Sequence, residues 1–108
     1  MNRYAISLFF ALTISIATAA SAFAATVNKN NTTVTRVYSS RDTLLVKLKA
    51  GTTGVGCSNE SWAKIDKTAP NWKEILNISM SAYLSGRKVN VRLANCDYYP
   101  LVHYIQLR

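Results

Sequence analysis

The first 24 residues set the limits of the fold, because they have the pattern of a removable export signal. Arg3 supplies a short basic start, and residues 5–20 are apolar apart from isolated Ser and Thr, with no charged side chain. The run ends in Ala-Phe-Ala at 22–24, which is the small-x-small pattern that precedes signal-peptidase cleavage. We therefore expect residues 1–24 to be removed and residues 25–108 to fold as a single domain, either in the periplasm or outside the cell.

The expected domain is small and contains both cysteines of the chain. Removing 24 of 108 residues leaves 84, and chains of this length bury a thin core and commonly depend on a covalent link or a partner subunit. Export exposes Cys57 and Cys96 to an oxidising compartment, so a disulfide between them is favoured over free thiols or a metal site. The single histidine leaves too few ligands for a metal, and no later segment is apolar enough to span a membrane.

Hydrophobic alternation predicts a chain of short strands in the expected domain. Residues 25–31 are polar without a clear period, and we expect a loose arm there. Trp62 and Ile65 are expected in the core, and His103 is expected on the buried side of the last strand. The glycine-rich segment 50–61 is expected to form a loop. The expected strands are 33–38, 43–49, 62–66, 89–94 and 101–107, with turns at 39–42 and 96–100.

A single amphipathic helix is expected between Pro70, which suits a first helical turn, and Gly86, which suits a helix end. Its apolar residues cover more of its circumference than one thin sheet can bury. Either the helix is deeply enclosed, or a partner subunit covers the excess. The candidate interface residues are Trp72, Leu76, Met80, Tyr83 and Leu84.

This order of elements predicts an α+β, mostly β, fold: a small antiparallel OB-like barrel with one helix. The residues show no catalytic constellation, since the acidic side chains have no motif spacing and His103 would be the sole base available. We expect a protein that is not an enzyme and that uses no cofactor.

The net charge of the expected domain is +7, which favours anionic partners. Two groups of residues are candidates for ligand binding: Arg36 and Tyr38 on one strand face, and Asp97, Tyr98 and Tyr99 in a turn. Tyrosines that merely pack or lie exposed are the ordinary alternative. Lys47, Lys49, Arg87, Lys88 and Arg92 are candidates for a basic surface. Because no exposed aromatic residues are expected between these cations, nucleic acid is an unlikely partner.

Several of these features together resemble small secreted bacterial proteins, which are in turn similar to the B subunits of subtilase cytotoxin and typhoid toxin. The resemblance rests on Cys57, Trp62, the helix at Pro70, the run 83–91 (YLSGRKVNV), Cys96 and Tyr99-Pro100. It implies an OB-type fold, a homopentamer with helices around a central pore, binding of cell-surface glycans, and a catalytic A-type subunit as a possible partner.

This chain departs from the toxin subunits at the sugar site that the resemblance implies. Leu93 stands where those subunits have an aromatic residue that helps hold the sugar, and Asn31, Thr32 or Thr33 is nearest to their sialic-acid-contacting serine. Three hypotheses therefore remain: a ring-forming glycan binder, an exported protein-binding or inhibitor domain without sugar affinity, and an OB-type binder of nucleic acid or anionic lipid.

Overall fold

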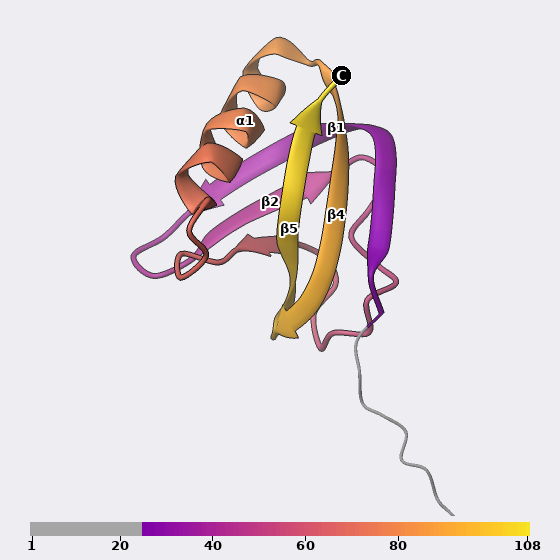
Figure 1. The fold of residues 1–108 in the computed structure, drawn as a ribbon, viewed down its shortest axis with the longest axis vertical. Helices are drawn as coiled ribbons and strands as arrows, with labels where there is room; N and C mark the ends of the chain where they lie inside the picture. The colour runs from indigo at the N-terminus through magenta and orange to yellow at the C-terminus, as the bar shows by residue number, and fades with distance from the viewer. Residues whose placement is uncertain (1–24) are drawn as a thin grey trace, which may run out of the picture.

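A computed structural model describes residues 25–108; the expected export signal lies outside the described residues. The described part contains five strands and one helix (Figure 1). In chain order they are β1 (Val27–Ser39), β2 (Leu44–Leu48), β3 (Ala63–Ile65), α1 (Trp72–Ser85), β4 (Lys88–Asp97) and β5 (Tyr99–Leu107). The expected mostly β fold with one helix is confirmed at this level.

The five strands form a closed barrel in the order β1-β2-β3-β5-β4. Strand β1 closes it, because its first half pairs with β4 and its second half pairs with β2. Neighbouring strands are antiparallel except β3 and β5, which run parallel and share the pair Lys64 and Leu101. Helix α1 packs against β1, β3 and β5 and lies beside the upper part of β5 in Figure 1.

The expectation of a loose arm at residues 25–31 is wrong, since β1 already begins at Val27. Val27 pairs with Leu93, and the following polar side chains alternate between half-buried and exposed positions while their backbone bonds to β4. The segment forms a strand because it pairs with β4, which is distant in the sequence, and its own polar side chains do not indicate a strand.

The core is built from the inward side chains of all five strands and from α1. Val89, Val91 and Leu93 are at most 1% exposed, as their alternation predicted. Ile65 is also fully buried, but Trp62 is half-buried and lies outside the core cluster, so the expectation that it is a core residue is wrong. The reason is its position: Ala63 and Ile65 take the two inward positions of the short strand β3.

Helix α1 buries Ile75, Ser79 and Ala82 against the barrel, and Gly86 ends it in the left-handed conformation with φ of 71°. The face next to this buried stripe stays open: Met80, Tyr83 and Leu84 are 37%, 44% and 75% exposed. Trp72 and Leu76 are half-buried beside them. The predicted excess of apolar surface is therefore present on the helix. Nowhere in residues 25–108 is there a helix with the length and hydrophobicity needed to cross a membrane.

In β5, the residues that point into the core differ from those that the hydrophobic alternation predicted. Val102 and Ile105 are buried, whereas His103 is exposed, so the expectation of a buried histidine is wrong. Val102 pairs with Leu93 and Tyr104 pairs with Arg92, which leaves His103 as an extra residue in β5. This β-bulge shifts the inward positions by one residue.

The expected disulfide between Cys57 and Cys96 is present, with a Cα–Cα distance of 5.5 Å. It joins the loop after β2 to the end of β4. The Asn59 N–H donates to the Tyr98 carbonyl oxygen at 2.9 Å, which is a second link between this loop and the β4–β5 turn. The expected turn at residues 96–100 is shorter than predicted, because β4 and β5 continue until only Tyr98, with φ of 65°, lies between them.

Candidate functional site

Register shifts interrupt the barrel strands at four places. One leaves Thr35 of β1 as an extra residue opposite β2, and the two described pockets lie beside the other three. In β1 an extra residue lies between Lys29 and Thr32, where Asn31 has φ of 55°. In β4 the extra residue is Asn95, with φ of 66°, and in β5 it is His103. Bulges turn side chains out of the regular alternation and are common next to binding sites. They therefore direct attention to these two places on the barrel.

The β1 pocket lies beside the first bulge and has a volume of about 290 Å³. Its lining residues are Asn31, Thr32, Thr33, Lys49, Ala50 and Lys88.

Backbone pairing brings the two lysines of the β1 pocket together. Thr33 pairs with Lys88 of β4, and the Lys49 N–H donates to the Thr33 carbonyl oxygen at 2.9 Å. The Ala50 N–H donates to Thr32 Oγ1 at 2.9 Å, which holds the chain after β2 against the bulge. In the described part of the chain no acidic residue lines this pocket. The pocket therefore combines two cations with polar side chains, as an anionic group requires.

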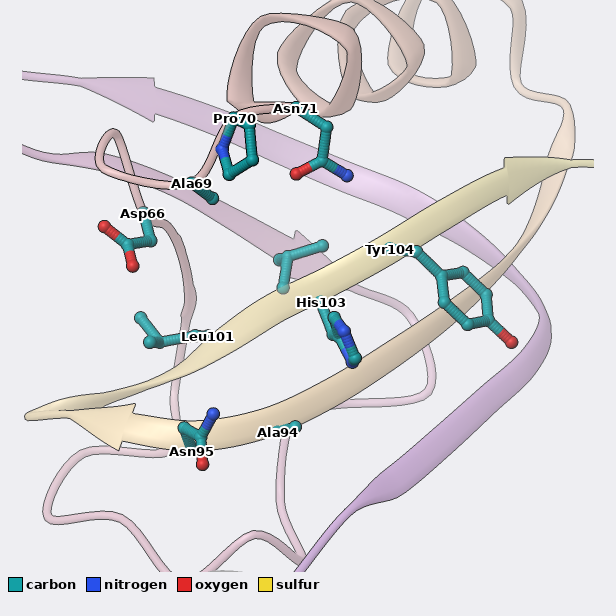
Figure 2. A pocket seen from close by; sticks show the side chains of 10 residues that line it. Asp66, Ala69, Pro70, Asn71, Ala94, Asn95, Leu101, His103 and Tyr104 are labelled. Carbon is teal, nitrogen blue, oxygen red and sulfur yellow. The ribbon is translucent and has the colours of Figure 1, made fainter.

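The β5 pocket lies over the outer side of β5 and has a volume of about 530 Å³ (Figure 2). One side is formed by the loop that leads into α1, with Asp66 and Asn71, and the other by Asn95 on β4. His103 of β5 lies between these two sides in Figure 2, and Tyr104 lies farther along the strand, at the right of the view. Acidic, amide, imidazole and phenol groups therefore meet in one hollow.

Asp66 is held as a carboxylate at the rim of the β5 pocket. The Thr68 hydroxyl donates to Asp66 Oδ1 at 2.7 Å and the Thr68 N–H donates to the same oxygen at 2.9 Å. These two hydrogen bonds, the hydroxyl first, lower the pKa of Asp66 below its ordinary value.

The first predicted ligand group, Arg36 and Tyr38, lies on the outer face of β1 and β2. Arg36 pairs with Lys47, whose Nζ lies 4.8 Å from the centre of the Trp62 ring, and the Tyr38 ring is 5.8 Å from the Trp62 ring. Cations and aromatic rings do alternate here, contrary to the expectation. Lys47 covers the Trp62 ring, whereas Tyr38 remains 47% exposed on the same face.

The second predicted ligand group stays together at the β4–β5 turn. Tyr98 is 60% exposed and meets Tyr99 edge to face, with 5.0 Å between the ring centres. Asp97 is paired with Lys64, whose Nζ lies 2.6 Å from its Oδ2. The carboxylate that was a candidate for sugar hydroxyls thus already has a partner. Neither predicted ligand group lines one of the two pockets described here.

The loop between β2 and β3 is ordered by Glu60. Its Oε2 accepts the Gly56 N–H at 2.7 Å and the Cys57 N–H at 3.2 Å. These bonds, the one from Gly56 first, lower the pKa of Glu60. An ionised Glu60 therefore helps to hold Cys57 in place for its disulfide.

Part of the site could be found in the sequence and part could not. Lys49 and Lys88 were among the candidate basic residues and line the same pocket, whereas the ammonium group of Lys47 lies over Trp62. No sequence signal marked Asn71 or Asn95, because Asn95 reaches the pocket through a bulge in β4 and Asn71 through the loop before α1.

Comparison with known proteins adds no relative, since no protein-family profile matches the chain and no curated protein is significantly similar to it.

Proposed function

We propose that residues 25–108 form an exported, non-enzymatic binding module of the toxin B-subunit type, and that the β1 pocket receives the acidic group of a cell-surface glycan. The observation that carries this proposal is that Lys49 and Lys88 line one pocket together with Thr33 and Asn31. Asn31, Thr32 and Thr33, the residues nearest to the sialic-acid-contacting serine of the toxin subunits, line this pocket, although the chain has no serine there.

The chemistry of the β1 pocket suits a sialic-acid carboxylate. Ammonium groups attract the carboxylate, and threonine and asparagine side chains exchange hydrogen bonds with hydroxyl and amide groups of the sugar. A volume of about 290 Å³ is near the lower end of the range of ligand pockets, about 300–1,000 Å³. The pocket therefore suits one terminal acidic sugar better than a long oligosaccharide.

The fold and the helix support the remaining parts of the proposal. A closed five-stranded barrel with one helix between β3 and β4 favours the OB-type assignment. The exposed stripe of Met80, Tyr83 and Leu84 next to half-buried Trp72 and Leu76 favours burial in a homopentamer. Such a ring has the form that a catalytic A-type subunit would dock against.

A second candidate function rests on the same helix. If its stripe contacts a different protein, the chain is an exported protein-binding or inhibitor domain without sugar affinity. The lysine pair in the β1 pocket favours the glycan hypothesis, because a protein-binding helix face does not require it.

The test compares binding of 3′-sialyllactose and lactose to oxidised residues 25–108 by calorimetry. We expect binding of sialyllactose alone, and a loss of about tenfold or more in affinity for Lys49→Ala with Lys88→Ala, which removes two charge-assisted contacts. The matched control is Arg41→Ala with Lys67→Ala, which removes the same charge from exposed positions outside both pockets. Equal affinity of the two double variants would contradict the proposed site.

A further inference from the structure

We propose that the β5 pocket is a second ligand site, which binds an uncharged, hydroxyl-rich ring of the size of a neutral pyranose sugar. The site is separate from the β1 pocket in both residues and chemistry. The inference therefore does not rest on the proposed binding of an acidic sugar.

Two bulges on neighbouring strands build this pocket. On β4, Ala94 pairs with Leu101 and Cys96 pairs with Pro100, so Asn95 is the unpaired residue between them. On β5, His103 is the corresponding extra residue. Both side chains line the same hollow, although regular alternation alone does not place them there (Figure 2). Bulges of this kind re-aim side chains and are common at the rims of barrels and next to active sites.

The polar groups of the pocket retain free hydrogen-bonding capacity. Both bonds from Thr68 go to Asp66 Oδ1, and among residues 25–108 no group donates to Oδ2. Asn71 precedes α1, yet its side chain makes no capping bond to the helix. The side chains of Asn95 and His103 likewise have no hydrogen-bond partner within the described chain. Carboxylate, amide and imidazole groups in this state match the donors and acceptors of adjacent ring hydroxyls.

Apolar surface between these groups provides the other half of a sugar site. Leu101 and Pro70 also line the hollow, together with Tyr104, which is 39% exposed. Arg92 Cζ lies 5.3 Å from the centre of the Tyr104 ring, so Leu101 and Pro70 supply the apolar surface that no cation covers. A pyranose presents hydroxyl groups at its edge and C–H groups on its faces, so it needs both kinds of surface. The volume of about 530 Å³ lies inside the range of ligand pockets.

Charge argues for a neutral ligand. Asp66 is the one acidic side chain among the described lining residues, and neither Lys nor Arg lines the pocket within residues 25–108. The Asp66 carboxylate therefore repels an anion, whereas it accepts hydrogen bonds from hydroxyl groups. This is the reverse of the β1 pocket, with its two lysines.

The disulfide holds one wall of the site in place. Asn95 directly precedes Cys96, whose bond to Cys57 ties the end of β4 to the glycine-rich loop. A wall held in this way stays in its binding conformation without a ligand, which reduces the entropy lost on binding.

The experiment is a titration of ¹⁵N-labelled, oxidised residues 25–108 with the methyl pyranosides of galactose, glucose, mannose, fucose and N-acetylglucosamine, followed by amide chemical shifts. We expect at least one of these sugars to shift the amide signals of Asn71, Asn95 and His103 in a saturable way. If no sugar of the panel shifts these signals, the inference is wrong, whatever the result with sialyllactose.

Two variants test the assigned residues while preserving the backbone. Asn95→Gly removes the side-chain amide at a position whose positive φ suits glycine, and Asp66→Asn removes the charge while keeping an oxygen for Thr68. We expect each to weaken binding about tenfold. The matched control is Asn77→Ala, which removes an exposed side-chain amide on α1 outside both pockets and is expected to leave this affinity unchanged. Unchanged affinity in both Asn95→Gly and Asp66→Asn would overturn the assignment, and the same spectra show whether each variant is folded.

Discussion

Removal of the disulfide provides the most quantitative test of how this small barrel is stabilised. The bond joins residues 39 positions apart, so Cys57→Ser with Cys96→Ser releases a loop of about 40 residues in the unfolded state. The chain-entropy relation gives a loss of about 4 kcal/mol at 25 °C for a loop of that length. Small domains have total stabilities of about 5–15 kcal/mol, so the double variant is expected to be only marginally folded.

The assay is equilibrium unfolding in urea without reductant, followed by the fluorescence of Trp62 and Trp72. With an m value of about 1 kcal/mol per M urea, we expect the midpoint to fall by roughly 4 M. Unfolding of the wild-type chain with dithiothreitol is the control, because reduction breaks the same bond without a substitution. A loss below about 1 kcal/mol with an unchanged m value would refute the entropic reasoning.

Three further variants test separate features of the fold. Gly86→Ala is expected to cost about 1 kcal/mol in urea unfolding, because φ is 71° and no atom contacts the added methyl group; an unchanged midpoint would show that the helix end relaxes. Leu93→Ala removes a side chain with no exposure and is expected to cost about 2–5 kcal/mol, whereas Leu84→Ala on the open helix face should change stability by less than about 0.5 kcal/mol in the separated subunit. The pKa of Glu60 is lowered in the folded state, so its carboxylate stabilises the fold above pH 4.5, and this contribution is lost as the pH falls through the folded-state pKa. Glu60→Gln should therefore unfold at a lower urea concentration than the wild type at pH 7, and the difference between their midpoints should shrink below pH 4.5.

The sequence contained enough information for those elements whose side chains alternate regularly. Val89, Val91 and Leu93 on β4 and the apolar stripe of α1 follow from local periodicity, because each buries one face against a single core. The disulfide was predicted from composition and from the expected export, since two cysteines in a small domain that is expected to be exported have few other uses.

The errors have a common physical cause, which is that long-range pairing overrides local pattern. The first half of β1 is polar and was expected to be an arm, but β4 provides its hydrogen bonds. His103 was expected to be buried, but the bulge in β5 turns it outward. Bulges depend on the register between two strands, so a single strand does not reveal them.

The same cause explains why the pockets were harder to predict than the fold. Asn95 and His103 acquire their positions from bulges, and Asp66 and Asn71 reach the same hollow through the loop before α1. Asp97, which was predicted to bind a ligand, instead pairs through its carboxylate with Lys64, a residue 33 positions away in the sequence. Among the pocket residues, the sequence identified only the basic side chains Lys49 and Lys88 as candidates, and the barrel determined which other side chains line the pockets.

Native mass spectrometry of oxidised residues 25–108, with and without 3′-sialyllactose, tests the central proposal most directly, because one spectrum reports both the assembly and the bound sugar. We predict a homopentamer that binds one sialyllactose per subunit and loses the sugar, but not the assembly, in Lys49→Ala with Lys88→Ala. A monomer that binds no sialyllactose would contradict the proposal of a ring-forming, glycan-binding module.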